Sequence, residues 1–243
     1  MHAFFVATVY QPLYNGVIFF ISLMPGANVG LAVISFTLLI KLILFPLSQK
    51  SVQTQFAMKA IEPELAEIKT KYKDSPQEQA KAVMQVYKDR NINPFSGILL
   101  LLIQFPILAA LYFIFARGGL PHIDMTLVYP FIHAAANMNL DFLGTSVADK
   151  STIFAILAGI TQFLQMQFVM PKAPPRAQGA DVSFKDELSR SMSVQAKYVM
   201  PFIMFLIARS FPAVVSLYLI TSSIFAVGQE LYVRRNYRKP IAA

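Results

Sequence analysis

Apolar residues in this 243-residue chain come in long blocks that alternate with polar stretches. Blocks of about 20 residues have the length of helix that crosses ~30 Å of hydrocarbon at ~1.5 Å per residue. The pattern therefore predicts an all-α integral membrane protein with five core transmembrane helices. The last two come from one apolar stretch that Phe211-Pro212 divides. The expected spans are residues 29–47, 95–116, 152–170, 195–210 and 213–233.

The first apolar block, residues 4–23, has a one-sided pattern. Its polar residues Thr8, Gln11, Asn15 and Ser22 fall on a single helical stripe. A helix with one polar stripe is typical of segments that lie in the membrane interface. We therefore expect residues 1–28 to form an N-terminal interfacial amphipathic helix. The alternative is a sixth span, which would move the N-terminus to the other side.

Residues 48–94 are polar and carry helical periodicity. One apolar stripe runs from Ile61 to Tyr72 and another from Ala80 through Met84 to Tyr87. Between them, Ser75 is expected to cap a new helix that starts at Pro76, with Glu78 closing a capping box. The segment is predicted to be a helical hairpin outside the membrane.

Charge sets the expected orientation. Hydrophobic residues make up 56% of the chain and charged ones 14%, well below the ~25% of soluble proteins. Seventeen of the 21 Lys and Arg residues fall in three segments, which the positive-inside rule assigns to the cytoplasm. These are the hairpin, loop 171–194 with the start of the following span, and the basic tail 234–243. Loop 117–151 is then extracytoplasmic, with the N-terminus outside and the C-terminus cytoplasmic.

Lys41 is the most informative polar residue because it lies inside the first core span. A lysine near mid-membrane costs ~2.5–3.5 kcal/mol on insertion scales, so such residues usually face a bundle interior or a wet cavity. Thr37 shares its face at i−4. The alternative is a lysine that snorkels to the nearer interface. Uncharged polar residues in other spans, which interhelical hydrogen bonding alone would also explain, are Gln104, Gln162, Gln165 and Ser222.

Several classes of chemistry lack their residues. The chain has no cysteine, its three histidines lie outside the predicted spans, and no Asp or Glu lies deep in a span. No phosphate-binding glycine loop or nucleophile–base–acid set is present. We therefore expect no enzyme, cofactor, metal site or specific nucleic-acid partner.

Several motifs, in order along nearly the whole chain, resemble the YidC, Oxa and Albino family of membrane protein insertases, in the short bacterial form. They are Gln11-Pro12-Leu13-Tyr14-Asn15, Lys41 through Phe45-Pro46-Leu47, Asn93-Pro94, Gln104-Phe105-Pro106, Ala110-Leu111-Tyr112, and Leu217-Tyr218 through Ser222-Ser223 to Gln229. The resemblance implies an insertase and chaperone of the bacterial inner or plasma membrane that needs no nucleotide. Its partners would be nascent membrane proteins and the lipid bilayer, with the Sec translocon and the ribosome left open.

The resemblance also implies a hydrophilic substrate groove. Lys41 would hydrate it and attract acidic residues of the substrate, other polar span residues would help line it, and the 48–94 hairpin would recruit substrate. Two positions depart from the family pattern: Lys41 replaces an arginine, which loses the forked guanidinium, and Leu219 stands where many members have an aromatic residue. Two further functions stay open: a small-solute or anion transporter that uses Lys41 as its binding charge, and a purely structural subunit.

Overall fold

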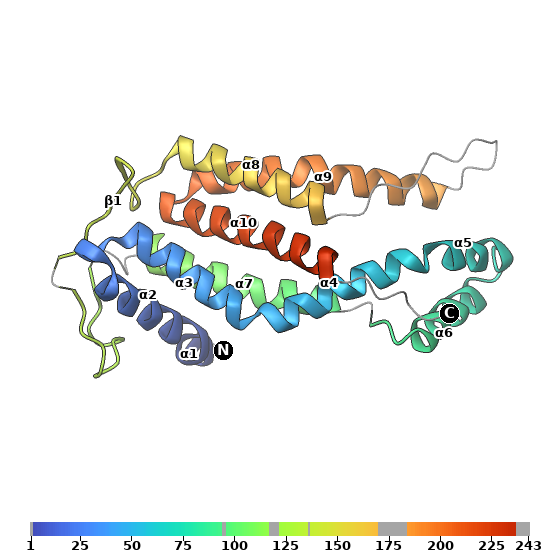
Figure 1. Ribbon diagram of the computed structural model, residues 1–243, viewed down its shortest axis with the longest axis horizontal. Helices are drawn as coiled ribbons and strands as arrows, with labels where there is room; N and C mark the ends of the chain where they lie inside the picture. Colours follow the sequence, from blue (N-terminus) through green and yellow to red (C-terminus); the bar gives the residue numbers. More distant parts are fainter. Residues whose placement is uncertain (1, 94–95, 117–121, 136, 170–183, 237–243) are drawn as a thin grey trace. The chain divides into compact units, whose positions relative to one another are not determined.

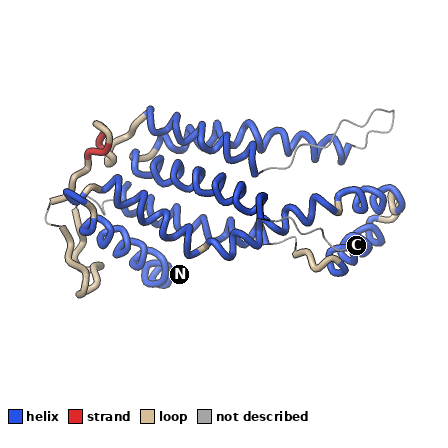
Figure 2. The backbone as a smooth tube through the Cα atoms, in the orientation of Figure 1, coloured by secondary structure: helices blue, strands red, loops and turns tan. Residues whose placement is uncertain are grey.

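Helices account for nearly all regular structure in the computed structural model, which describes residues 2–93, 96–116, 122–135, 137–169 and 184–236 (Figure 2). A short antiparallel pair of strands interrupts the loop before α8. The elements are α1 His2–Phe5, the π-helix η1 Val6–Tyr10, α2 Gln11–Leu23, the 3₁₀ turn η2 Pro25–Ala27, α3 Val29–Ile43, α4 Phe45–Ala60, α5 Glu62–Lys71, α6 Pro76–Asp89, α7 Ser96–Ala116, β1 Asp141–Phe142, β2 Thr145–Ser146, α8 Thr152–Val169, α9 Phe184–Ser210 and α10 Ala213–Asn236.

The all-α membrane class is confirmed, whereas the number of spans stays a prediction. Among the described residues, three helices are long and apolar enough to cross a membrane: Val6–Leu23, Thr152–Val169 and Ala213–Asn236. A fourth is obtained if α3 and α4, separated by Leu44, form one broken span, and α7 contains a shorter apolar stretch, Leu102–Phe115. Helix α9 begins at Phe184, so a loop running as far as residue 194 is wrong. Residues 170–183 and 237–243 of the predicted loop and tail lie outside the described residues.

The chain forms two compact units, of which the first comprises Met1–Ile43 and Phe105–Gly228. Within it, α8 lies alongside α9 (Figure 1). Small residues let these two helices approach closely: Ala155 and Ala158 of α8 and Ala208 of α9 form a buried cluster. Gly159 continues this face, because a Cβ atom there would lie 3.1 Å from the Cβ of Phe205. Such small-residue contacts are a common way for membrane helices to associate.

Helices α2 and α3 also pack together in the first unit. The buried face of α2 carries Tyr14, Val17, Ile18 and Ile21, and Gly16 lies against the ring of Phe36 on α3. A Cβ atom at position 16 would overlap the ring, so a larger residue there would displace Phe36.

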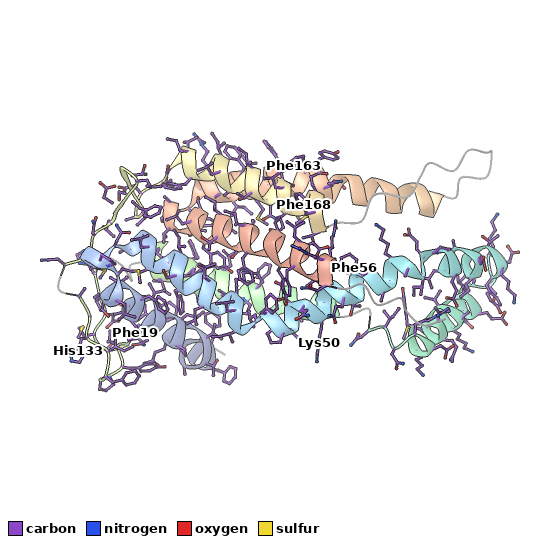
Figure 3. All side chains as sticks on the ribbon, viewed as in Figure 1. Phe19, Lys50, Phe56, His133, Phe163 and Phe168 are labelled. Atoms are coloured by element: carbon purple, nitrogen blue, oxygen red, sulfur yellow. The ribbon has the colours of Figure 1, made fainter. Side chains whose placement is uncertain are left out.

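Large apolar side chains point away from the protein along several helices. Phe19 of α2, labelled in Figure 3, is 45% exposed, and Ile153 and Ile160 of α8 are 69% and 50% exposed. Contiguous exposed apolar surface is unfavourable in water but expected where lipid surrounds the helix. The exposed apolar residues therefore agree with the membrane assignment.

The second unit comprises Leu44–Gln104 and Gln229–Ala243 and includes the packed pair α5 and α6. Ile61, Val86 and Ile92 form its buried cluster. The predicted second stripe is partly wrong, because Met84 is 48% exposed and Val86 takes the buried position.

Ser75 is the N-cap of α6 and Pro76 its first helical residue, as predicted. The capping box is wrong, because no side-chain cap hydrogen bond forms at this terminus. The backbone hydrogen bond from Gln79 N–H to the Ser75 carbonyl begins the helix instead.

Candidate functional site

The predicted site residues fall into both compact units. Gln104 belongs to the second unit, and the remaining six belong to the first. These six are Thr37 and Lys41 on α3, Gln162 and Gln165 on α8, and Leu219 and Ser222 on α10.

Thr37 and Lys41 lie one turn apart on the same face of α3. The Thr37 hydroxyl is buried and donates a 2.6 Å hydrogen bond to the Val33 carbonyl of its own helix. Lys41 is half-buried in the last turn of α3, which ends at Ile43. A cation is favourable at this position because the carbonyl end of a helix carries partial negative charge.

A run of buried hydroxyl groups marks the middle of α10. Ser216, Thr221, Ser222 and Ser223 are all less than a tenth exposed. The Ser223 hydroxyl lies 3.2 Å from Oε1 of Gln162, a hydrogen bond that joins α10 to α8. Gln162 therefore forms an interhelical hydrogen bond, which was the alternative to a groove-lining role. Its partner, Ser223, was not among the predicted site residues. Gln165, half-buried one turn further along α8, shares this side of the helix.

Leu219 faces the contact between α8 and α9. It packs against the cluster of Ala155, Ala158 and Ala208. An aliphatic side chain fits among these alanines, so its contribution here is to helix packing.

Segment 139–149, which contains β1 and β2, joins the N-terminal ends of α3 and α10. Asn139 exchanges backbone hydrogen bonds with Ala27 and Val29 on either side of Asn28. At the other end, Asp149 and Val147 accept hydrogen bonds from the N–H groups of Ala213 and Val214 at 2.7 and 3.0 Å. We call residues 139–149 the tether segment. It fixes two helices that carry polar site residues at the same end of the first unit.

Phe142 adds a side-chain contact to the tether segment. Its ring lies directly against Gly30 of α3, where a Cβ atom would overlap it. The ring also lies 6.2 Å, centroid to centroid, from that of Phe154 on α8. Phe142 thus extends the tether from α3 to a third helix.

The Gln11-Pro12-Leu13-Tyr14-Asn15 motif binds the loop between α7 and α8. Asn15 donates to the Leu127 carbonyl at 2.8 Å and accepts from Tyr129 N–H at 2.7 Å. Gln11 also donates to the Leu127 carbonyl, and the Tyr14 hydroxyl accepts from Asp124 N–H. Two of the four residues in the predicted polar stripe therefore face protein, so the stripe does not argue for an interfacial position. Both alternatives for residues 4–23, an interfacial helix and a sixth span, therefore stay open.

Near Asp124, loop hydrogen bonds hold a carboxylate in its charged form. The Thr126 hydroxyl and backbone N–H donate to Asp124 Oδ1 at 2.6 and 3.0 Å. These donors lower the pKa of Asp124.

In the second unit, the end of α10 contacts α4 through polar groups. Gln229 donates to the Ser48 hydroxyl at 2.6 Å and to the Phe45 carbonyl at 3.4 Å. Glu230 is buried and pairs with Arg234 at 2.9 Å, while the Arg234 guanidinium lies over the Phe56 ring. Gln229 could be singled out in the sequence because it ends one of the family motifs. No sequence pattern indicated the contacts of Glu230 and Arg234. No cluster of potential metal ligands occurs among the described residues.

These features define a multi-pass helical membrane protein with buried polar groups between apolar helices. Residues 19–240 match the family described as 60Kd inner membrane protein, and the chain belongs to this family. A relative from Clostridium tetani (strain Massachusetts / E88), named "Membrane protein insertase YidC", is 31% identical over 88% of this chain and 86% of its own length.

Relatives from Chlorobium limicola and Francisella tularensis subsp. novicida carry the same name. They are each 31% identical, over 85% and 87% of this chain. The chain spans 33% of the length of either relative, so these two proteins contain large regions that have no counterpart in the alignment.

Proposed function

We propose that this protein inserts newly made membrane proteins into the lipid bilayer. Membership of the 60Kd inner membrane protein family carries the proposal, and the name of the Clostridium relative, which matches over most of both chains, supports it. Nascent membrane proteins are the substrates and the bilayer is the site of action. The same family resemblance supports the bacterial inner or plasma membrane as the location.

The proposed substrate path is a hydrophilic groove in the first unit, lined by Lys41, Thr37, Gln162, Gln165 and Ser222. Lys41 keeps water in the groove and attracts acidic residues of the incoming polypeptide. At an effective dielectric constant of ~20, two opposite charges about 8 Å apart attract by ~2 kcal/mol, roughly thirtyfold in an equilibrium. The groove lowers the cost of moving a polar tail because water accompanies it part of the way. The groove opens toward the cytoplasm, and the tether segment closes its other end by holding α3 and α10 together.

No nucleotide is required in this proposal because the substrate itself supplies the driving force. Each central Leu, Ile, Phe or Val contributes about −0.3 to −0.6 kcal/mol when a span enters lipid. About 20 such residues outweigh the cost of a short polar tail that crosses with water. The protein acts by lowering the barrier.

The proposed topology has five core spans, with the N-terminus outside and the C-terminus in the cytoplasm. The uneven distribution of Lys and Arg supports this orientation. Residues 48–94 then form a cytoplasmic hairpin that recruits substrate, and the basic residues from Arg234 onward attract anionic lipid. If the protein binds the Sec translocon or the ribosome, the hairpin and the basic C-terminal residues are the proposed contact sites.

The test is insertion of a small Sec-independent protein with an acidic N-terminal tail into proteoliposomes. Lys41→Glu should reduce insertion strongly, and Lys41→Arg should retain it because the charge is kept. Lys197→Glu is the matched control: it makes the same charge change at a half-buried position on α9, outside the groove residues and the hairpin. A substrate with a basic tail should be inserted better by Lys41→Glu than by the wild type.

Equal insertion by Lys41→Glu and the wild type would refute the electrostatic role of Lys41. Failure of the wild-type protein to insert any substrate, together with flux of a small anion through the same liposomes, would favour the transporter. Activity that survives every Lys41 substitution, including Lys41→Met, would leave Lys41 with a structural role.

A further inference from the structure

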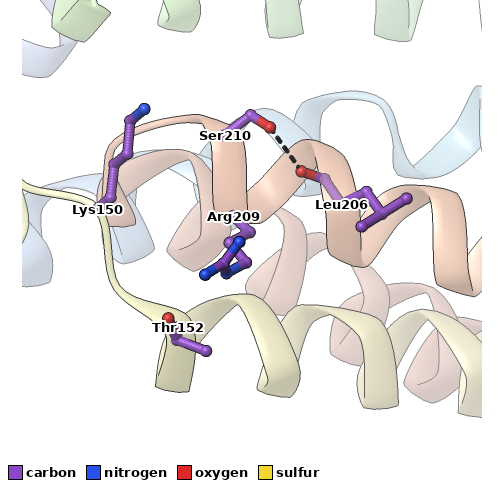
Figure 4. Close-up of a pocket in the computed structure, with 5 residues that line it drawn as sticks. All are labelled: Lys150, Thr152, Leu206, Arg209 and Ser210. Atoms are coloured by element: carbon purple, nitrogen blue, oxygen red, sulfur yellow. Dashed lines mark hydrogen bonds between the residues drawn. The ribbon is translucent and has the colours of Figure 1, made fainter.

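A small cavity lies where α8 begins and α9 ends, apart from the polar residues proposed to line the groove. It has a volume of about 340 Å³ and is lined by Lys150, Thr152, Leu206, Arg209 and Ser210 (Figure 4). All five residues belong to the first compact unit. Two of them are cationic, and neither forms an ion pair among the described residues.

Hydrogen-bond donors meet in this cavity from two elements. In Figure 4 the Arg209 guanidinium lies on the side of α9 that faces Thr152, whereas the Lys150 side chain extends away from both; Lys150 lines the cavity from the loop before α8. Ser210 does not add a donor, because its hydroxyl donates to the Leu206 carbonyl at 2.8 Å.

The first turn of α8 adds favourable backbone groups. Ser151 precedes the helix, and its hydroxyl lies 3.4 Å from the Phe154 N–H. That contact occupies the Phe154 N–H. The N–H groups of Thr152 and Ile153 have no acceptor within the helix, and the helix dipole favours negative charge there. Two cations, one hydroxyl donor and a helix N-terminus are the groups that bind phosphate oxygens.

The depth of the cavity identifies the source of the phosphate. Thr152 is the first residue of the apolar helix Thr152–Val169, whose 18 residues span ~27 Å, about the thickness of the hydrocarbon core. The cavity therefore lies at one membrane boundary, the level of lipid headgroups. Leu206 and Ile153, which are 46% and 69% exposed, provide apolar surface beside it for an acyl chain.

We propose that this cavity binds the phosphate group of an anionic phospholipid. Arg209 and Lys150 neutralise the phosphate, Thr152 donates a hydrogen bond to it, and the acyl chains lie on the exposed apolar surface of α8 and α9. The site does not depend on the insertase proposal; with the proposed orientation, it lies in the outer leaflet.

Native mass spectrometry of the full chain in detergent tests the site by measuring retained lipid. The probes are phosphatidylglycerol, a diacylglycerol with the same chains, and glycerol phosphate without chains. The wild type should retain one phosphatidylglycerol about tenfold more strongly than the double variant Lys150→Gln/Arg209→Gln, which removes both charge-assisted contacts. Lys59→Gln/Lys88→Gln is the control, because it removes two charges at exposed positions of the second unit.

Equal retention by the wild type and the cavity variant would overturn the proposal. Diacylglycerol retained as well as phosphatidylglycerol would show apolar adhesion without phosphate recognition. Glycerol phosphate that displaces the lipid at equal concentration would identify a site for soluble anions. A thermal melt of each variant, expected within about 1 °C of the wild type for these exposed residues, separates loss of binding from loss of folding.

Discussion

Asn28 joins the tether segment to α3 through two side-chain hydrogen bonds, and two different substitutions can separate their contributions to stability. Its side-chain oxygen accepts from Leu31 N–H at 3.0 Å, which makes Asn28 the N-cap of α3. Its amide group donates to the Asp141 carbonyl at 2.7 Å, inside the tether segment. Asn28→Ala loses both interactions. A lost N-cap costs ~1 kcal/mol and a lost hydrogen bond a further ~1 kcal/mol, about 2 kcal/mol together.

This loss should lower the apparent melting temperature in detergent by about 4–8 °C, using the scale for chains of 150–250 residues. Asn28→Asp keeps the capping oxygen but removes the donor to Asp141, so it should lose about half as much or slightly more. Ser22→Ala is the control, because the exposed Ser22 hydroxyl bonds only within its own helix. A melting temperature of Asn28→Ala equal to that of Ser22→Ala would show that the Asn28 side chain contributes nothing to the cap or to the tether segment. Asn28→Asp that melts with the wild type would assign the whole effect to the cap.

Three further outcomes follow from the fold. Gly159→Leu should separate α8 from α9 and lower the melting temperature. Gly228→Leu should be tolerated, because among the described residues no atom beyond its own stretch of helix lies within 4 Å of a Cβ there. Leu143 lies before Gly144 in the turn between the strands, is 84% exposed and has a φ of 55°. Leu143→Asn should raise the melting temperature, because Asn adopts a positive φ more readily. An unchanged or lower melting temperature would contradict this. The two donors from Thr126 lower the pKa of Asp124 in the folded protein. The charged carboxylate therefore stabilises the loop at pH values above the pKa of Asp124 in the unfolded chain. This stabilisation is lost as the pH falls through the pKa of Asp124 in the folded protein. Thr126→Val should therefore raise the pH at which Asp124 titrates in NMR, and an unchanged pH would exclude the contact.

Helix positions could be predicted where local signals are strong. A helix expected at 152–170 is observed at Thr152–Val169, and the break at Phe211-Pro212 separates α9 from α10. Proline and the long apolar run act locally, so they are visible without a partner. The start of α9 was missed because its first turns are polar and resemble a loop in a hydropathy reading.

Contacts between distant segments could not be predicted. Asn15 reaches residues 112 and 114 positions away, and periodicity within its own helix contains no information about them. The tether segment acts mostly through backbone groups, which every sequence possesses. Ser223 was one of several hydroxyls on α10, and only the relative rotation of α8 and α10 makes it the partner of Gln162.

Water access to the polar residues of the first unit tests the central claim most directly. The chain has no cysteine, so single cysteines can be introduced and labelled with a membrane-impermeant maleimide without removing a native thiol. Cysteines at Lys41 and Gln165 should react in inverted vesicles, which expose the cytoplasmic side, and should not react in right-side-out vesicles. A cysteine at the lipid-facing Ile160 should react in neither. Labelling of Lys41 and Gln165 from both sides, or from neither, would contradict a groove that opens only toward the cytoplasm.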